Sequence, residues 1–350
     1  MASCNHCSAT MLQIFQQIFE NNEKTLAIFR SHGVLPSMVM CGKCKVPCNR
    51  QVLENGKIIW RCYKTFPILK TKRRRACNFT STDYKGTFLS HSRLEPWQIA
   101  GFIAFNMQSF YTHEMASENF HISLNTCVDW RSFCSEVMIS WYDNQEPIGG
   151  HDIVVEIDET LITRRKYGVG RVTLNTQQVW LFGGIERASK KRFVIPLLDD
   201  NDEPLPRSRE VLMGYIIRFI KPGTTIYSDE WAAYRSLKDE GYIHKTVNHS
   251  VNFLNPDDPN VHTQTIERSW QDVKKGIKRQ GMRRHFLRQY LGRYLFLTRF
   301  GKSAFHQFLL AAARLYPPQG ERKVVFDEQQ DDEFLYDYNF SDDPAADTNL

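Results

Sequence analysis

The chain has 350 residues, which is enough for a large hydrophobic core and two or three domains. No apolar run reaches the length of a membrane-spanning helix, and the first residues lack the basic region, apolar core and cleavage site of a secretion signal, so we expect a protein that is neither membrane-embedded nor secreted. The formal net charge is +6 and the isoelectric point is near 8.8, but the nine acids after Lys323 leave +15 for the rest of the chain. A basic body suits a polyanionic partner, although charge alone would also fit an ordinary soluble protein.

The first predicted element lies between residues 8 and 32, where apolar residues recur mostly at three- and four-residue spacing. This pattern predicts an amphipathic helix or a helical hairpin within an N-terminal segment of residues 1–37. Its apolar face either packs within its own domain, which we favour, or forms a dimer contact. Cys4 and Cys7 precede it without a second pair nearby, so we do not assign them to a metal site.

A group of five cysteines lies in the second predicted domain, residues 38–92. They are Cys41, Cys44, Cys48, Cys62 and Cys77. In a compartment that keeps thiols reduced, a C-x-x-C pair on a tight turn and two later thiolates suit tetrahedral Zn²⁺, and a hairpin between Val52 and Trp60 would make this segment a zinc ribbon. Cys48 could replace one of the ligands, and the alternative to a zinc site is a set of scattered buried cysteines.

A basic run from Lys70 to Arg75 places five cations in six positions, inside the gap between Cys62 and Cys77. Its last four members are Lys72, Arg73, Arg74 and Arg75. Such a run is usually a solvated loop, but it is also typical of a phosphate-contacting surface or a nuclear-import signal. Beside a zinc ribbon, we interpret it as a phosphate contact.

Helical patterns dominate a third predicted domain, residues 93–145. The expected helices cover residues 97–110, 115–120 and 128–138. The last two, with the turn between them, have the size of a DNA-binding helix-turn-helix, in which Ser123 or Asn125 would cap the second helix. Thr126 and Arg131 would then face a DNA groove. Many helical pairs share this pattern without touching DNA.

Residues 143–150 combine Asp, Asn, Pro and Gly and are expected to form a linker to a domain of residues 150–312. The strands predicted there cover residues 153–158, 179–185, 192–198, 225–229 and 244–248, and the helices cover residues 209–220, 231–240 and 265–278. Three strands before the first helix allow an antiparallel meander to which the later strands add in parallel. This order predicts an α/β domain with a mixed five-stranded sheet, flanking helices and an RNase H-like fold.

Three acids stand at unusual places in these elements. Asp158 ends the first strand, Asp229 ends the fourth, and Glu267 lies on the last helix. An ionised acid that closes a core strand needs a cation or hydrogen bonds to compensate its burial, although a strand that runs out into solvent would also end in acids. A layered sheet can bring the three together. Their hard oxygen ligands suit two Mg²⁺ or Mn²⁺ ions that clamp the attacking and leaving oxygens of a phosphodiester.

Six short motifs occur in a definite order along this domain. They are V-E-I-D-E-T from Val155, K-Y-G-V-G-R from Lys166, W-L-F-G-G-I-E-R from Trp180, P-G-T-T-I-Y-S-D from Pro222, V-N-H-S-V-N-F from Val247 and H-T-Q-T-I-E-R-S-W from His262. As a set they resemble the Merlin superfamily of cut-and-paste DNA transposases and the bacterial insertion-sequence transposases with an ISXO2-like domain, over residues 152–299. The resemblance implies a DDE catalytic domain in which Asp158, Asp229 and Glu267 are the catalytic residues and metal ligands. Some bacterial relatives have Asn where Gln264 stands and use it as the third ligand, so Gln264 stays open as an alternative to Glu267.

The resemblance also bears on the flanking segments. It supports a zinc ribbon whose ligands by position are Cys41, Cys44, Cys62 and Cys77. Because the family places a DNA-binding domain ahead of its catalytic domain, it supports the helix-turn-helix as well. It further implies that Lys274, which falls on about the same helix face as Glu267, holds a phosphate of the scissile strand.

Other basic residues are candidates for DNA contact. A predicted hairpin with two glycines can bring its backbone close to a phosphate, although a solvated loop explains it nearly as well. Its cations are Arg164, Arg165, Lys166 and Arg171. Lys275 follows Lys274 on the last helix. We interpret His262 as a substrate contact or a residue behind the acids, and His249 as an ordinary core or cap residue.

Together these inferences describe a metal-dependent DDE transposase that cleaves and transfers DNA strands. It would bind terminal inverted repeats and target DNA as a homodimer or larger assembly, with zinc as a structural ion. The alternatives are a domesticated DNA-binding regulator that no longer cuts and an RNase H-like nuclease without strand transfer. We expect a nuclear location in a eukaryotic host and a cytoplasmic one otherwise, and we expect residues 313–350 to form a disordered acidic tail.

Overall fold

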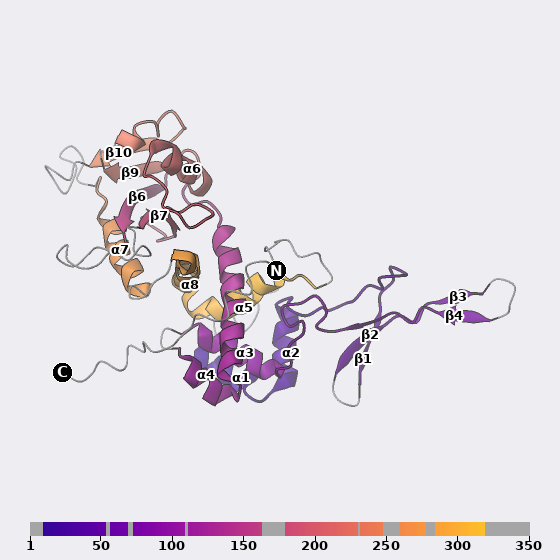
Figure 1. Ribbon diagram of the computed structural model, residues 1–350. Coiled ribbons are helices and arrows are strands. Elements are labelled where there is room, and N and C mark those ends of the chain that lie inside the picture. The colour runs from indigo at the N-terminus through magenta and orange to yellow at the C-terminus, as the bar shows by residue number, and fades with distance from the viewer. Residues whose placement is uncertain are drawn as a thin grey trace, which may run out of the picture. The chain divides into compact units, whose positions relative to one another are not determined.

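The computed structural model describes residues 10–53, 57–68, 73–108, 111–162, 179–229, 232–247, 260–277 and 284–318. The chain divides into two compact units, Met1–Val137 with Lys302–Leu350 and Met138–Gly301 (Figure 1). The predicted domain ends at residues 145 and 312 differ from these boundaries, because one long helix continues past residue 137 and the last helix returns to the first unit. No helix in the described part of the chain is long and apolar enough to cross a membrane.

The helices of the first unit are α1 (Met11–Ile18), α2 (Asn22–Ser31), α3 (Pro96–Asn106), α4 (His113–Phe120), the first part of α5 (Leu124–Asp143) and α9 (Ala304–Leu315). Within residues 8–32 the structure has a helical hairpin. Thr10 caps α1 with a capping box, and the Asn21 side chain accepts the Lys24 N–H at 2.9 Å to cap α2. Phe15 of α1 stacks on Phe120 of α4 with ring centroids 6.3 Å apart. The apolar face of α1 therefore packs within its own unit.

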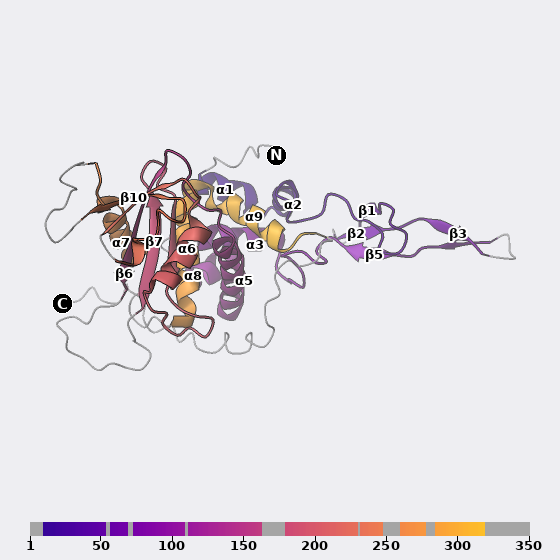
Figure 2. The same cartoon turned by 90° about the horizontal axis from the view of Figure 1, so that it is seen from above.

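Five short strands of the first unit lie between Asn49 and Thr82. They are β1 (Asn49–Val52), β2 (Ile58–Arg61), β3 (Thr65–Pro67), β4 (Arg74–Ala76) and β5 (Thr80–Thr82). β1, β2 and β5 form an antiparallel sheet that contains the predicted hairpin, and β3 pairs with β4 in a separate two-stranded ribbon (Figure 2). The buried Trp60 donates its indole N–H to Asp83 at 2.9 Å, and Arg30 pairs with the other oxygen of Asp83. This network ties the sheet to α2.

Local capping fixes the turn between α4 and α5. His121 ends α4 with a left-handed φ of 53°, and Ser123 Oγ accepts the Thr126 N–H at 3.1 Å. Ser123, rather than Asn125, is therefore the cap of α5. α5 extends beyond the predicted residues 128–138 in both directions, because its later turns enter the core of the second unit, where Tyr142 is buried and donates its hydroxyl to the Val194 carbonyl at 2.8 Å.

The second unit is built on a mixed five-stranded sheet in the order β10-β9-β6-β7-β8. The strands are β6 (Val154–Leu161), β7 (Trp180–Glu186), β8 (Arg192–Pro196), β9 (Thr225–Asp229) and β10 (Ile243–Val247). β6, β7 and β8 form an antiparallel meander, and β9 and β10 add in parallel on the other side of β6. The predicted strand order is confirmed, and the sheet fits an RNase H-like domain.

The C-terminal end of the predicted linker, residues 143–150, is packed into the second unit. Ile148 is buried and forms a bridge with Ile220, and the Gly149 N–H donates to a Glu186 oxygen at 2.7 Å. Gly149 has a φ of 84°, and a Cβ there would lie 2.4 Å from Thr224 Oγ1. Glycine is therefore required at residue 149, and the segment is closely packed against the second unit. The composition of the segment did not indicate this packing.

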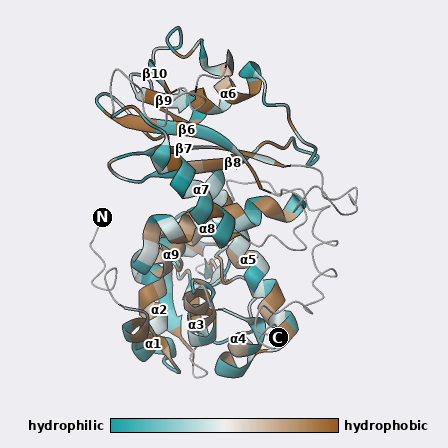
Figure 3. Ribbon diagram, turned by 90° about the vertical axis from the view of Figure 1, so that its left-hand side faces the viewer, coloured by the Kyte–Doolittle hydropathy of each residue, from teal (hydrophilic) through white to brown (hydrophobic). Residues whose placement is uncertain are grey.

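The longer helices of the second unit besides α5 are α6 (Arg209–Phe219), α7 (Gln264–Gly276) and α8 (Leu287–Phe300). α7 and α8 carry both hydrophilic and hydrophobic residues, as Figure 3 shows, and α7 buries Ile266, Trp270 and Val273 at helical spacing. This pattern is typical of helices that cover one face of a sheet.

The helix predicted for residues 231–240 is wrong over the residues that the structure describes there. Ala232–Tyr234 form a 3₁₀ helix, and further turns follow with Leu237 N–H donating to Tyr234 at 3.1 Å and Asp239 N–H donating to Ser236 at 3.0 Å. Tyr234 and Leu237 are both buried. Because they are three residues apart, the tight i→i+3 geometry directs both side chains into the core.

Candidate functional site

Asp158 and Asp229 lie on neighbouring parallel strands. The ladder between β6 and β9 pairs Glu156 with Tyr227. Two residues further along each strand come Asp158 and Asp229, so this register places both on the same face of the sheet and at the same level. Adjacent strands run about 4.8 Å apart, which makes the two aspartates neighbours.

Asp158 does not end its strand as the sequence predicted. β6 continues to Leu161 because β7 pairs with it as far as Leu161 opposite Trp180, whereas the ladder to β9 stops at Glu156. Asp158 therefore has a strand partner on one side, Gly183 of β7. On its other side the ladder to β9 has already ended at Glu156.

Helix α7 packs along β6 on the face of the sheet that carries Asp158. Three hydrogen bonds join them: Ile266 N–H to Glu156 Oε2 at 2.9 Å, Trp270 Nε1 to Asp158 Oδ2 at 2.9 Å and Lys274 Nζ to Thr160 Oγ1 at 2.6 Å. Four helix residues advance about 6.0 Å and two strand residues about 6.6 Å, so the contacts stay in step over both elements. The spacing of α7 is thus matched to the alternation of β6.

Gly183 leaves the space that Trp270 fills. A Cβ at residue 183 would lie 2.6 Å from Trp270 Cη2 and 3.0 Å from the backbone oxygen of Phe193. Because Gly183 is the cross-strand partner of Asp158, the missing side chain is what allows the indole to reach that carboxylate.

The carboxyl group of Asp158 is in an electrostatically unfavourable place. Burial raises its pKa to about 6, and the charges of Asp229 and Glu267 act in the same direction. The Trp270 indole and the backbone N–H of Glu159 oppose this change but do not cancel it. The charges of Asp229 and Glu267 therefore disfavour the ionised form of Asp158. A cation bound among the three acids would offset both the cost of burying this charge and the repulsion between the carboxylates.

Glu267 lies in the first turn of α7 and is exposed, one residue after the Ile266 that contacts β6. Among the residues that the structure describes, four cysteines form a tight cluster of possible metal ligands. The carboxylate oxygens of the three acids do not approach one another as closely as those sulfur atoms do. As a donor set, two neighbouring aspartates and a nearby glutamate still fit Mg²⁺ or Mn²⁺, which take carboxylate oxygens and keep several waters.

Sequence reasoning missed the buried acid Glu156. Its side chain is wholly buried, Arg187 Nε lies 2.9 Å from Glu156 Oε1, and His262 Nδ1 lies 3.8 Å from the same oxygen. Arg187 also contacts the His262 ring, and burial together with the Arg187 charge lowers the pKa of His262. His262 is therefore part of the support of the α7 N-terminus. The available signal was the two-residue step that puts Glu156 and Asp158 on one face of β6.

Glu159 faces the opposite side of β6 from Asp158. Arg207 Nη1 lies 4.0 Å from Glu159 Oε2, and the Arg207 guanidinium lies 3.7 Å from the centre of the Trp180 ring. Burial raises the pKa of Glu159 to about 8, with Asp158 and Asp229 acting in the same direction and Arg207 opposing them. Glu159 is therefore mostly protonated at neutral pH and adds little negative charge beside the aspartates.

Four cysteines of the first unit form a cluster that is compatible with a zinc site. They are Cys41, Cys44, Cys62 and Cys77, with all four sulfur atoms within 4.8 Å of one another. The recorded Sγ–Sγ distances are 3.5 Å for Cys41–Cys77, 3.2 Å for Cys44–Cys77 and 4.0 Å for Cys44–Cys62. Zn–S bonds of 2.3 Å in a tetrahedron require sulfur separations of about 3.8 Å, so the cluster has the right size for one Zn²⁺.

The four thiols influence one another's ionisation. Burial acts to raise the pKa of the Cys41 thiol, but backbone N–H groups of Cys44 and Lys43 donate to its sulfur and bring the pKa below its ordinary value. The hydrogen bond with Cys77 and burial raise the pKa of Cys44 to about 12. Cys48 is buried next to the cluster but is not among the four clustered sulfurs, which favours it as a packing residue.

The residues predicted to contact DNA lie in both units. Arg73, Arg74 and Arg75 are exposed on or beside β4, and Arg74 Nε donates to Thr65 Oγ1 at 2.8 Å. The remaining described candidates are Thr126 and Arg131 on α5, Lys274 and Lys275 on α7, and His262 just before α7. Lys72, Arg164, Arg165, Lys166, Arg171 and His249 lie outside the described residues.

The sheet order fits an RNase H-like domain, and two aspartates on neighbouring strands with an acid-bearing helix fit the donor set of metal-dependent phosphoryl transfer. Residues 144–300 match the family model of the ISXO2-like transposase domain. The match covers less than half of the chain, includes all three acids and supports a DDE transposase family. Such a family implies an enzyme that binds DNA and depends on divalent metal ions. A comparison with curated proteins finds no match for the chain.

Proposed function

We propose that this protein is a cut-and-paste DNA transposase of the Merlin superfamily. It binds the terminal inverted repeats of its element, cleaves the element ends and joins them to target DNA. The observation that carries the proposal is the placement of Asp158 and Asp229 on adjacent parallel strands, with α7 and Glu267 beside them, inside the region that matches a transposase domain.

Asp158, Asp229 and Glu267 are the residues that would hold two divalent ions. When bound, such ions activate a water or a 3′-hydroxyl and stabilise the leaving oxygen during in-line attack at phosphorus. The protein's contribution is to position the ligands. Trp270 fixes one oxygen of Asp158 and leaves the other for a ligand bond. The Glu156–Arg187 pair holds the first turn of α7, and so the helical position of Glu267.

In this proposal Lys274 binds a phosphate of the scissile strand. It lies about two turns after Glu267 on α7, half-buried, with its ammonium group 2.6 Å from Thr160 Oγ1. Because Thr160 follows Asp158 by two residues on β6, the cation stands on the same strand face as the aspartate.

The first unit supplies DNA binding in this proposal. The ribbon around the four cysteines, stabilised by one Zn²⁺, would contact phosphates, and α4 with α5 would act as a helix-turn-helix that reads the terminal repeats. Two element ends must be joined, so the active form is a homodimer or a larger assembly on DNA. In a eukaryotic host the protein would act in the nucleus.

The direct test is incubation of the full chain with its own flanking repeats and Mg²⁺, with cleavage and joining scored separately. Asp158→Asn and Asp229→Asn should abolish cleavage and leave repeat binding nearly intact, because the ligands are lost but the basic surfaces remain. Asp239→Asn, which changes an exposed acid of the same unit, is the matched control. Wild-type cleavage by either aspartate variant would refute the site. Binding without cleavage by the wild type would indicate a regulator, and cleavage without joining a nuclease.

The third ligand needs its own comparison. Glu267→Gln should abolish cleavage, and Asp272→Asn, an exposed acid further along α7, should not. Loss of activity in Gln264→Ala but not in Glu267→Gln would reassign the third ligand to Gln264.

A further inference from the structure

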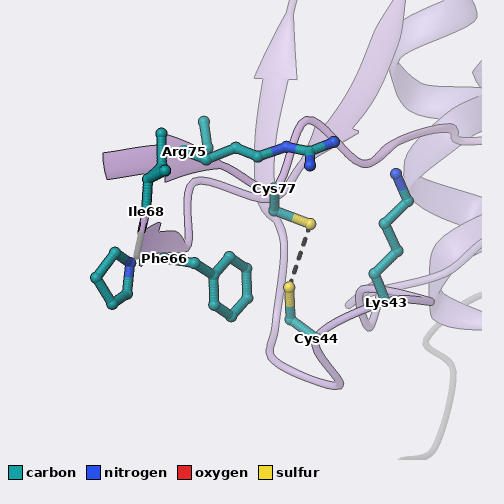
Figure 4. A pocket seen from close by; sticks show the side chains of 8 residues that line it. Lys43, Cys44, Phe66, Ile68, Arg75 and Cys77 are labelled. Atoms are coloured by element: carbon teal, nitrogen blue, oxygen red, sulfur yellow. Dashed lines mark hydrogen bonds between the residues drawn. The ribbon is translucent and has the colours of Figure 1, made fainter. Parts of the chain in front are cut away.

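A cavity of about 420 Å³ lies beside the cysteine cluster. Cys44 and Cys77 stand at its base, Lys43 borders it on one side, and Phe66, Ile68 and Arg75 border it on the β3–β4 side (Figure 4). Its volume falls within the roughly 300–1,000 Å³ of pockets that hold small molecules.

One face of the β3–β4 ribbon and its continuation supplies Phe66, Ile68, Arg75 and Cys77 to this lining. Phe66 pairs directly with Arg75, so the two side chains share a face. The ladder continues on both sides, since Cys77 N–H donates to Lys64 at 2.8 Å and Ile68 N–H donates to Arg73 at 3.0 Å. Two-residue steps put Lys64, Ile68, Arg73 and Cys77 on the face of Phe66 and Arg75. This face therefore alternates apolar and cationic side chains outward from a zinc-ligand thiol.

The apolar side chains of this face are exposed. Phe66 is 42% exposed and Ile68 is 40% exposed, and they lie on a two-stranded ribbon with no further strand paired to it in the described sheet. Lys64 Nζ lies 5.6 Å from the centre of the Phe66 ring. An aromatic ring that is bordered by cations and open to solvent is a stacking surface for another planar ring.

The charge around the cavity identifies a polyanion as the partner. Residues 38–82 contain eleven Lys or Arg residues and one acid, Glu54. Four thiolates on one Zn²⁺ leave a charge of about −2, which is small beside the eleven cations of this segment. Most of these cations are therefore in excess of what the metal cluster and Glu54 need.

We propose that this cavity binds one unpaired nucleotide of a DNA strand, with the base stacked on Phe66 and a flanking phosphate held by Lys43 and Arg75. The inference rests on the proposed function in taking DNA as the partner. A base within a duplex is stacked on its neighbours, so the ring of Phe66 is suited to a base that has left the helix, as at a frayed or cleaved element end. Every base has a π-face that can stack on an aromatic ring, so we expect this binding to tolerate different sequences.

The test measures fluorescence anisotropy of the zinc-loaded full chain with three labelled probes: a short oligothymidylate, the same strand with abasic sites, and a blunt duplex of equal length. Phe66→Ala should weaken oligothymidylate binding about tenfold, the effect of losing one stacked base, and leave the abasic strand and the duplex nearly unaffected. Phe66→Trp should restore the affinity. Val52→Ala, which shortens a side chain 62% exposed on β1, is the matched control.

The cations have a separate readout. Lys43→Gln and Arg75→Gln should weaken the normal and the abasic strand equally and flatten the salt dependence, whereas Arg50→Gln on β1 should do so less. Zinc content of every variant verifies that the ribbon is intact. If Phe66→Ala leaves oligothymidylate binding unchanged, or weakens all three probes alike, the stacking site is refuted while the transposase function stands. If the wild type binds none of the probes, the proposed function fails as well.

Discussion

Replacing Gly183 with alanine tests whether the open space opposite Asp158 is what lets Trp270 hold that carboxylate. The new Cβ would lie 2.6 Å from Trp270 Cη2 and 3.0 Å from the backbone oxygen of Phe193. The Phe193 backbone is fixed in the ladder between β7 and β8, so the indole has to move. Overpacking of this kind costs about 1–3 kcal/mol, and a lost hydrogen bond to a charged group costs about 1.5–3 kcal/mol.

We therefore expect Gly183→Ala to destabilise the protein by about 2.5–6 kcal/mol and to lower its melting temperature by roughly 5–25 °C. Cleavage should fall as well, because Asp158 loses the donor that orients it. Trp270→Phe in the same chain removes the outer indole ring and makes room for the new Cβ. The double variant should be more stable than the sum of the two single changes predicts, by about 1 kcal/mol or more, but its cleavage should stay low since no N–H reaches Asp158.

Urea and thermal unfolding of the full chain measure the stability terms, and cleavage of repeat DNA measures the activity. Gly214→Ala is the control, because this exposed glycine of α6 has nothing within 4 Å of its added Cβ. It should stabilise the protein by about 0.5–1 kcal/mol and leave cleavage unchanged. A Gly183→Ala variant as stable as the wild type, or strict additivity in the double variant, would refute the reasoning.

Three further predictions concern other parts of the molecule. Folding raises the pKa of Glu159 from 4.5 to about 8, so the folded state binds more protons than the unfolded state between these pH values and its stability falls as the pH rises. Glu159→Gln should therefore stabilise the metal-free protein by a few kcal/mol at alkaline pH but little near pH 4.5. Equal pH dependence of urea unfolding in the variant and the wild type would contradict this. Metal analysis should find about one zinc per chain, and chelation should unfold residues 38–90. Cys62→Ser should lose the zinc, whereas Cys4→Ser, Cys7→Ser and Cys48→Ser should retain it. Purified wild type without zinc would exclude the site. Neutralising Lys72, Arg73, Arg74 and Arg75 should weaken binding to all DNA sequences and reduce the slope of log affinity against log salt concentration by about one per lost phosphate contact. Substitutions from Thr126 to Arg131 should instead reduce discrimination between terminal repeats and random DNA. If the basic-cluster variant loses sequence preference and the helix variants keep it, the assigned roles are reversed.

The sequence by itself determined the elements whose signal is local. Alternating and apolar runs located the five strands seen in the described part of the second unit, in their observed order, and the C-x-x-C pair predicted the hairpin of β1 and β2 that follows it. Asp158 and Asp229 stand out in the sequence because each follows a β-prone run, where an acid is unusual whatever the fold. These features depend on residues within a few positions of one another, which is why they can be read without a partner.

The tertiary structure decided the features that depend on distant partners. β6 extends past Asp158 because β7 pairs with it, and Asp158 is held by a tryptophan 112 residues away. The burial of Glu156 follows from its contact with the start of α7, 110 residues away. Residues 232–240 fold into tight turns because Tyr234 and Leu237 enter the core, although their sequence favours a helix. Periodicity encodes which face of an element is apolar, but which element covers that face, and so which polar group meets Asp158, is set only when the sheet and α7 pack together.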